Sequence, residues 1–466
     1  MRVLPIIAAL CLIGCNKPPT DKGPPKDGPT DTDTTTDTDT VDFAEQAMEY
    51  FATHVQESLD ESGVPGASLA VVFEGQIYTA TLGIRRIGND SSVEEHTPFL
   101  VGSMTKTVLV AAILQLMDDG AFALDTKLDS LVPGTVTDGT FDEDIELRHL
   151  LTHSSGFPPF FEFGCNDAAE PLGDWLTRME PLDVWVAPDT LFSYSNSGFG
   201  LVARSAEVAT GDPYEQIVTE LVFDPVGMVN SSYVTPGTER AYGHVGPPWS
   251  STQTDDFDCA SVRAAGGIWG TATDMALFAQ AIMDGTLPHT DRYLSEAIPT
   301  GRGEDIDYGF GIFKEPYRGL EIASHGGSVN GYGAAFTLVP AEDFAVVTLL
   351  NGFTVAGDPF EIGKSAIDFF LQPGGGLPTI NPDPDLWETW AGDYTAMSGG
   401  ILQASVVDDE MQVAVPAQGV EMNLPYDAGQ TFRVSDDGIL RVTFWMDDSG
   451  QPEWMSTPWG IGAWTP

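Results

Sequence analysis

The first part of the chain shows two different periods of hydrophobic and polar residues. From residue 41 to residue 62, apolar side chains recur at the spacing of a helix with one buried face. Residues 65–84 instead alternate between apolar and polar side chains, and Glu74 and Gly75 interrupt the alternation at a point suited to a tight turn. The pattern therefore predicts a helix followed by a two-stranded hairpin.

A second helix is expected from residue 103 to residue 120, where the chain reads SMTKTVLVAAILQLMDDG. Its side chains are apolar on nearly every side between Val108 and Met117, and a helix that is hydrophobic all round is a buried one. Gly120 stands where a glycine commonly ends a helix. The sequence thus predicts a core helix with Ser103 and Lys106 in its first turn.

Helical spacing dominates the middle of the chain, and strand patterns return after about residue 300. Alternating stretches occupy residues 308–315, 320–327, 333–340 and 344–352, and residues 359–371 have the pattern of a closing helix. Strands at both ends of a helical middle predict an α+β fold. One antiparallel sheet is assembled from the two chain ends, a helical lobe is inserted, and a cleft lies between them. This region forms a domain at residues 42–371.

The C-terminal part has a different composition. Residues 372–385 read QPGGGLPTINPDPD, and their proline and glycine content predicts a linker. Residues 386–466 contain alternating runs separated by aspartate and glycine turns, which is typical of a small all-β domain. Because this domain contains no histidine, cysteine or lysine, we expect it to have a structural or docking role.

The N-terminal 15 residues, MRVLPIIAALCLIGC, combine an early arginine with a short apolar run, as in a secretory signal peptide. Their ending resembles the lipobox of bacterial lipoproteins, in which the cysteine is lipidated after cleavage. We therefore expect Cys15 to anchor an exported protein to the cell envelope, and Asn16 favours the outer membrane. Residues 16–41 are rich in proline, threonine and aspartate and predict a disordered tether.

The net charge of the chain limits its binding partners, and its cysteine content limits its disulfides. The chain has 20 lysine and arginine residues against 69 aspartate and glutamate residues, a net charge of −49. This charge argues against nucleic acid as a partner and limits membrane contact to the lipid on Cys15. Cys165 and Cys259 can form one disulfide in an exported protein, with two free thiols as the alternative. No histidine spacing suggests a metal site, and no cofactor is expected.

Candidate chemistry begins with Ser103 and Lys106. Residues three apart share one face of a helix, so the lysine amine should face the serine hydroxyl. Burial and the positive end of the helix dipole both disfavour the ammonium form and lower the lysine pKa. A neutral amine could take the serine proton and create a nucleophile. Taken alone, the pair fits better a serine helix cap followed by an exposed lysine.

Two further motifs change this interpretation. Residues 192–200 read FSYSNSGFG, and residues 324–332 read SHGGSVNGY. In this order, the three motifs resemble the penicillin-recognising serine hydrolases, which include class C β-lactamases, D,D-peptidases, D-aminopeptidases and related esterases. The resemblance runs from about Val41 to Leu371. It implies a β-lactamase/transpeptidase-like fold and an enzyme that hydrolyses an ester or amide through an acyl-enzyme.

The resemblance also implies a role for each matching residue. Ser103 would be the acylated nucleophile, and Lys106 would accept its proton. Tyr194 would relay the proton to the leaving group. The backbone amides of Ser103 and Ser328 would form the oxyanion hole, with two donors directed at the developing charge.

Asn196, Gly327 and His325 would lie beside the substrate. Glycine at 327 would let a ligand run along an edge strand. β-Lactamases of this group usually present a lysine where this chain has His325, and imidazole is largely uncharged near neutral pH. We therefore favour a short-chain ester or a D-amino-acid peptide, including one derived from peptidoglycan, over a β-lactam. His149 and His153 are expected to order a loop.

Other functions stay open at this point. A non-catalytic lipoprotein could use a penicillin-binding-like cleft to bind the cell wall, or the C-terminal domain could be an interaction module with the hydrolase as its scaffold. An α/β-hydrolase is disfavoured because the G-x-S-x-G motif is not present, and residues 326–330 depart from it at the last position. The sequence specifies neither the substrate nor the oligomeric state.

Overall fold

A computed structural model describes most of the chain from residue 43 onward. The segments that it does not describe are residues 1–42, 90, 135–136, 139–143, 159–170, 177–181, 247–249, 252–259, 289–291, 294–307, 330, 353–357, 372–386, 388–389, 397–399, 408–409, 417–419, 425, 429–430, 434–440, 447–451, 458–459 and 466. The expected signal peptide, lipidated Cys15, tether, Cys165–Cys259 disulfide and linker all lie outside the described residues and stay predictions.

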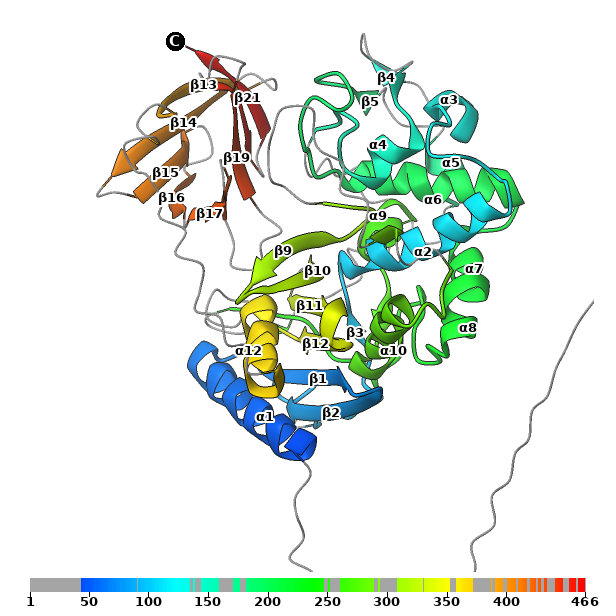
Figure 1. Ribbon diagram of the computed structural model, residues 1–466, viewed down its shortest axis with the longest axis vertical. Helices are drawn as coiled ribbons and strands as arrows, with labels where there is room; N and C mark the ends of the chain where they lie inside the picture. The colour runs from blue at the N-terminus through cyan, green and yellow to red at the C-terminus, as the bar shows by residue number, and fades with distance from the viewer. Residues whose placement is uncertain are drawn as a thin grey trace, which may run out of the picture. The chain divides into compact units, whose positions relative to one another are not determined.

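A six-stranded antiparallel sheet combines strands from both ends of residues 43–371 (Figure 1). Its order is β2 (Gln76–Gly83), β1 (Gly66–Phe73), β12 (Phe344–Leu350), β11 (Tyr332–Val339), β10 (Leu320–Val329) and β9 (Phe313–Tyr317). The predicted hairpin and the four returning strands are confirmed. The strand expected at residues 308–315 begins later, at Phe313, because Gly311 has φ 72° and interrupts the extended backbone.

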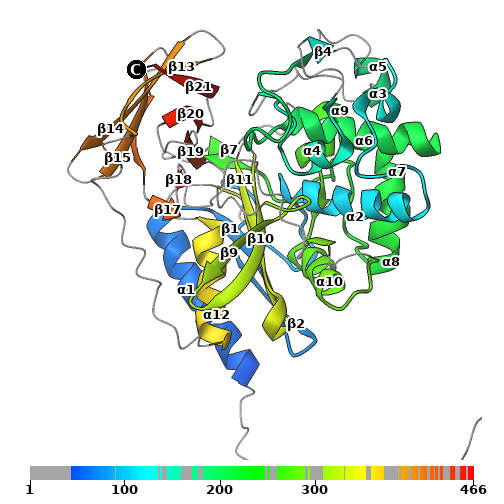
Figure 2. The ribbon, with the colours of Figure 1, turned by 45° about the horizontal axis from the view of Figure 1, so that its top comes forward.

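Helices cover both faces of this sheet (Figure 2). On one face, α1 (Phe43–Ser62) and α12 (Pro359–Leu371) pack on each other and on Leu69 and Val71 of β1. On the other face, α10 (Ala272–Met283) packs against β1 and β12, where Ala70 and Val72 point. Successive side chains of a strand point to opposite faces, so a strand covered on both sides is apolar throughout.

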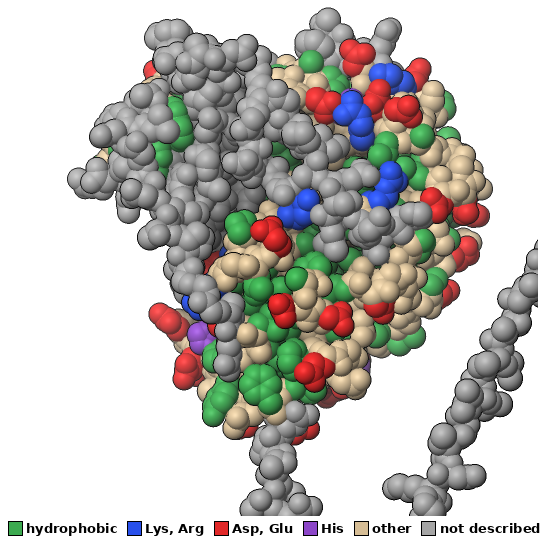
Figure 3. All heavy atoms as spheres, in the orientation of Figure 1, with side chains coloured by type: hydrophobic (Ala, Val, Ile, Leu, Met, Phe, Trp, Pro, Cys, Tyr) green, Lys and Arg blue, Asp and Glu red, His purple; other side chains and the backbone are tan. Residues whose placement is uncertain are grey.

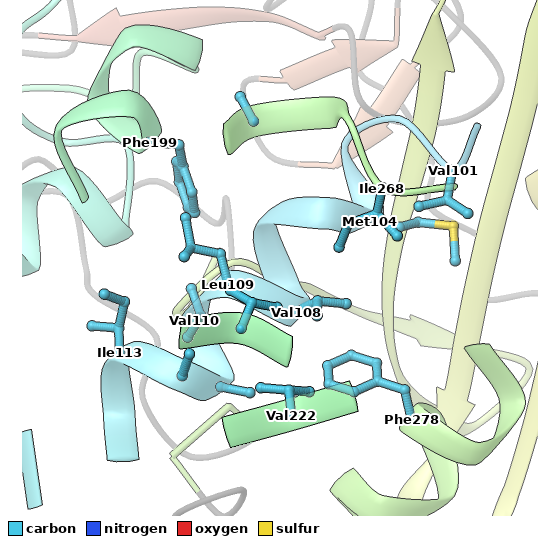
Figure 4. Packing of buried hydrophobic residues seen from close by; sticks show 14 of the residues in the cluster. Val101, Met104, Val108, Leu109, Val110, Ile113, Phe199, Val222, Ile268 and Phe278 are labelled. Atoms are coloured by element: carbon cyan, nitrogen blue, oxygen red, sulfur yellow. The ribbon is translucent and has the colours of Figure 1, made fainter. Parts of the chain in front are cut away.

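The helical lobe is built around α2 (Met104–Asp118), which is buried along nearly its whole length. Figure 4 shows Val108, Leu109 and Val110 of α2 among apolar side chains of neighbouring segments, including Phe199 and Phe278. The predicted core helix is confirmed. The other helical segments are α3 (Leu128–Leu131), α4 (Leu147–Leu151), α5 (Leu172–Leu176), α6 (Asn196–Thr210), α7 (Tyr214–Val218), the π-helix η2 (Thr219–Phe223), α8 (Asp224–Val226) and α9 (Ala260–Gly266), with the 3-10 turn η4 (Pro340–Glu342) between β11 and β12.

Short two-stranded pairs complete this part of the molecule. They are β3 (Phe99–Leu100) with β8 (Trp269–Gly270), β4 (Thr137–Asp138) with β5 (Leu182–Asp183), and β6 (His244–Val245) with β7 (Ser250–Ser251). The first pair joins the segment before α2 to the segment after α9. Leu100 lies four residues before α2 begins, and it pairs with Trp269, which follows α9.

Nine strands form a second antiparallel sheet in the C-terminal part. Its order is β16 (Val420–Leu424), β15 (Glu410–Val415), β14 (Gly400–Val407), β13 (Gly392–Ala396), β21 (Gly460–Thr465), β20 (Pro452–Thr457), β19 (Arg441–Met446), β18 (Thr431–Arg433) and β17 (Tyr426–Ala428). Among the described residues these strands pair only with one another, and Tyr394, Met411 and Met455 are fully buried. The expected all-β character of this part is confirmed.

On the face of the molecule in Figure 3, acidic side chains are scattered over the described residues, and several basic ones lie among them. None of the helices that the structure describes combines the length and the apolar character needed to cross a membrane.

Two glycines let β10 cross directly over the residues that precede α2. A Cβ atom at Gly327 would lie 2.0 Å from the carbonyl oxygen of Val101, and one at Gly102 would lie 2.9 Å from the Gly327 Cα atom. Gly102 also has φ 56°, a region that favours glycine. The sequence suggested that Gly327 makes room for a ligand. The structure shows that its missing side chain makes room for the chain itself.

We expect Gly327→Ala to lower the free energy of unfolding by about 1–3 kcal/mol, because the added methyl group forces the two backbones apart. Gly200→Ala is the matched control: its Cβ would meet nothing within 4 Å, and it lies inside α6. That change should raise stability by about 0.5–1 kcal/mol. Urea unfolding of both variants measures the difference. Equal stability of Gly327→Ala and the unmodified protein would contradict the close crossing.

Candidate active site

Ser103 and Lys106 face each other at the start of α2. The Lys106 Nζ atom lies 3.0 Å from the Ser103 Oγ atom and donates a second hydrogen bond to the Ala265 carbonyl oxygen at 2.8 Å. Ser103 precedes the first residue of α2, but its side chain forms no helix-capping hydrogen bond. Lys106 is fully buried. The alternative of a serine cap with an exposed lysine is therefore wrong for this pair.

The surroundings of the Lys106 amine are apolar and aromatic. Its Nζ atom lies 4.8 Å from the centre of the Tyr194 ring and 5.6 Å from that of Phe199. Burial holds the pKa of Lys106 well below its ordinary value, because an ammonium ion loses its hydration there. Among the described residues no carboxylate forms an ion pair with it. The site thus favours a neutral amine next to a serine hydroxyl.

Tyr194 reaches the serine–lysine pair from the residues just before α6. Ser195 caps this helix, since its hydroxyl accepts a hydrogen bond from the Gly198 amide at 3.3 Å. The cap fixes the direction in which the preceding Tyr194 leaves the helix, and Tyr194 is buried beside Lys106. Asn196, the first residue of α6, is half-buried between buried neighbours. The structure therefore brings Tyr194 to the serine–lysine pair.

His325 lies on β10 with both ring nitrogens engaged. Its Nδ1 atom is 2.7 Å from the Gly326 carbonyl oxygen, which can only accept, so Nδ1 carries the proton. Its Nε2 atom is then free to accept from the Tyr308 hydroxyl at 3.2 Å. Burial, with the nearby Lys106, lowers the pKa of His325 to about 3. An uncharged group at this position agrees with the expectation from the sequence.

The C-terminal half of β10 lies next to the start of α2. β9 pairs with β10 only from Leu320 to Ser324, so β11 is the one strand, among the described residues, that pairs with residues 325–329. Ser328 is exposed. A Cβ atom at Gly102 would lie 3.1 Å from the Ser328 amide nitrogen. The backbone segments that carry the amides of Ser103 and Ser328 therefore lie next to each other.

Two of these contacts could not be found from the sequence. The carbonyl of Ala265 is a backbone group, so no residue type marks it. Tyr308 begins the stretch YGFGI, and nothing in that stretch indicates a bond to His325.

His149 orders the loop before it, as expected. Its Nδ1 atom accepts from the Glu146 amide at 2.9 Å, so its Nε2–H donates to Asp189 at 3.1 Å. His153 packs against Tyr194, with the two ring centres 4.1 Å apart. In the part of the chain that the structure describes, no cluster of three or more histidine, cysteine, aspartate or glutamate side chains is placed to hold a metal ion.

Comparison with known proteins places this geometry in a family. A family model described as Beta-lactamase matches residues 51–366. Penicillin-binding protein 4 of Amycolatopsis lactamdurans is 26% identical over 335 residues, which cover 66% of this chain and 86% of that protein. D-alanyl-D-alanine-carboxypeptidase/endopeptidase AmpH of Escherichia coli K12 is 26% identical over 249 residues, which cover 51% of this chain and 62% of that protein.

The solved structures agree on the fold. The octameric penicillin-binding protein homologue from Pyrococcus abyssi superposes with a TM-score of 0.61 at 19% identity, covering 89% of this chain and 99% of that one. This similarity confirms the β-lactamase/transpeptidase-like fold. The matched residues 51–366 make up more than half of the chain and include all of the site described above. The chain is therefore a member of the beta-lactamase family, and it is an enzyme of the serine hydrolase type found among its homologues.

Proposed function

We propose that this protein hydrolyses an ester or an amide through an acyl-enzyme on Ser103. The observation that supports the proposal most directly is the buried Lys106 amine, 3.0 Å from the Ser103 hydroxyl. A serine hydroxyl is a weak nucleophile until a base removes its proton. The depressed pKa of Lys106 increases the share of neutral amine that can act as that base.

The proposed reaction has two halves. In the first, Lys106 takes the proton of Ser103 while Oγ bonds to the substrate carbonyl carbon, and the amides of Ser103 and Ser328 stabilise the negative oxygen. Tyr194 then delivers a proton to the leaving group as its bond to the carbonyl carbon breaks, and the Lys106 ammonium returns a proton to Tyr194. In the second half, water gives up a proton to the neutral Lys106–Tyr194 pair as its oxygen bonds to the acyl carbon. The pair passes this proton to Ser103 Oγ as the ester bond breaks, which releases the acid and restores the serine hydroxyl.

The charge of the site favours a substrate without a carboxylate at the position of His325. This imidazole is uncharged, and its two nitrogens bind Gly326 and Tyr308. The net charge of −49 adds a field that disfavours anions. A short-chain ester therefore fits best. For a D-amino-acid peptide, including a peptidoglycan fragment, the same reasoning favours cleavage away from a free carboxylate.

The location that we propose for this activity rests on the N-terminal sequence. A lipid on Cys15 and a flexible tether over residues 16–41 would hold the enzyme at the cell envelope and let it reach substrates in its surroundings. The C-terminal sheet is proposed to serve as a structural or docking domain.

Ser103→Ala should abolish covalent labelling by a fluorophosphonate and lower ester turnover by at least about a thousandfold, because the nucleophile is lost. Its thermal unfolding should stay close to that of the unmodified protein, since only a hydroxyl group is removed. Ser130→Ala, which changes an exposed serine, serves as the control and should label normally. Labelling that persists in Ser103→Ala would refute the assignment.

Lys106→Met should abolish turnover. Its free energy of unfolding should also rise relative to that of the wild type as the pH falls, because the wild type loses stability over this range and the variant does not. The folded-state pKa of Lys106 lies below its unfolded value, so the unfolded wild-type chain binds a proton more tightly. Wild-type stability therefore decreases as the pH falls from about 10, by up to about 1.4 kcal/mol per pH unit, until the folded-state pKa is reached. The variant lacks this contribution.

Urea unfolding of both proteins at several pH values between about 10 and 7 measures the effect. A constant difference in stability over that range would show that Lys106 is not shifted by burial.

A hydrolysis screen tests the substrate preference. We expect measurable turnover of neutral short-chain esters and poor turnover of β-lactams that carry a carboxylate. His325→Lys should raise the ratio of β-lactam to ester turnover about tenfold, because one charge-assisted hydrogen bond is added. His325→Gln, which keeps the site neutral, separates charge from shape. Efficient β-lactam hydrolysis by the unmodified protein, or the same ratio in both variants, would count against the preference.

A further inference from the structure

His153 contacts Tyr194 and both of its neighbours in the chain. The amide of Ser193 donates to the His153 carbonyl oxygen at 2.7 Å, and the amide of Ser195 donates to its Nδ1 atom at 3.0 Å. Between these two bonds, the Tyr194 ring packs on the imidazole with the ring centres 4.1 Å apart. Both neighbours of Tyr194 in the chain, and its own ring, are therefore fixed by one residue.

The same imidazole also contacts the other groups of the site. Its ring centre lies 5.0 Å from that of Tyr308, which binds His325, and 5.1 Å from that of Phe199, which faces the Lys106 amine. His153 thus packs against aromatic side chains that in turn contact His325 and Lys106.

Two features of His153 are energetically unfavourable: a buried N–H without a hydrogen-bond partner among the described residues, and a positive φ. Because Nδ1 accepts from the Ser195 amide, Nε2 carries the proton of the neutral ring, yet this buried nitrogen has no hydrogen-bond partner among the described residues. Its backbone has φ 56°, where residues with side chains are rare. A phenylalanine would avoid the unpaired N–H, and a glycine would avoid the strain. Only histidine supplies a flat ring together with an acceptor at the Nδ1 position.

A second strained residue holds the loop of His153 in place. Asp189, with φ 61°, accepts hydrogen bonds on its carboxylate from Arg148 at 2.7 Å and from Ser154 at 3.1 Å. Its amide donates to the Ser154 carbonyl at 2.9 Å. These bonds join Asp189, on the segment that leads to Tyr194, to Ser154, the residue that follows His153.

We propose that His153 is a positioning residue for Tyr194, fixing the phenol beside Lys106 through the two flanking hydrogen bonds and the packed ring. This inference rests on the proposed function, in which Tyr194 delivers a proton to the leaving group. It goes beyond a loop-ordering role, because it assigns to His153 an effect on one chemical step.

The dependence on the leaving group gives a test. An alkoxide leaving group needs a proton as its bond breaks, whereas p-nitrophenolate leaves without one. A displaced Tyr194 should therefore slow ethyl esters much more than p-nitrophenyl esters. Misfolding or loss of protein would lower both rates by the same factor.

Three variants of the full-length protein separate the contacts. His153→Phe keeps a ring but removes the acceptor, and His153→Asn keeps an acceptor and tolerates the positive φ but removes the ring. His244→Phe is the matched control: His244 is also fully buried, and it binds Ile87 and Asn351 rather than any residue of the site.

We expect His153→Phe and His153→Asn to lower the ratio of ethyl to p-nitrophenyl ester acylation by about tenfold, part of what a general acid contributes. His244→Phe should leave this ratio unchanged. In a Tyr194→Phe background, His153→Phe should cause no further loss on the ethyl ester, because the two residues act as a unit. If one His153 variant does not fold, the other carries the test.

An unchanged ratio in a folded His153 variant would overturn the inference while leaving the proposed function intact, provided that the unmodified protein is acylated on Ser103. An additive loss in the double variant would also overturn it. Absence of acylation in the unmodified protein would remove the proposed function, and the inference with it.

Discussion

The burial of one amine in the first turn of α2 is the constraint on which the rest of the site depends. Lys106 can serve as a base only if its charge is disfavoured, and this requires that water be excluded on every side. The apolar side chains around α2 supply that exclusion, together with the rings of Tyr194 and Phe199. The apolar sequence of the helix is thus a condition of the proposed chemistry as well as of the fold.

A close approach of backbones connects this helix to the sheet. Gly102 and Gly327 let β10 pass over the start of α2 with no side chain between them, which brings Ser328 next to Ser103. The nucleophile and the second amide of the proposed oxyanion hole therefore belong to segments more than 200 residues apart in the sequence. Their relative position is set by packing that admits only glycine, so it does not depend on a flexible contact.

The polar groups around the amine are kept neutral by the same dry surroundings. His325 and His153 are both buried, and burial lowers the pKa of each below its ordinary value, with the nearby Lys106 adding to the effect. Tyr308 is buried too, which raises its pKa. A site built from uncharged donors and acceptors suits a neutral substrate, and a charge introduced at one of these groups would disfavour charge on the others.

The sequence by itself determined the local features: the hairpin, the buried helix, and the serine and lysine three residues apart on one face. These follow from the period of apolar residues and from helix geometry, which act between near neighbours. The order of the motifs and their resemblance to a family indicated which distant segments meet. Only the tertiary structure decided that the Ala265 carbonyl binds Lys106, that Gly327 makes room for Val101, and that His153 packs on Tyr194. Such contacts join backbone groups or residues far apart in the chain, and no residue type or spacing identifies them.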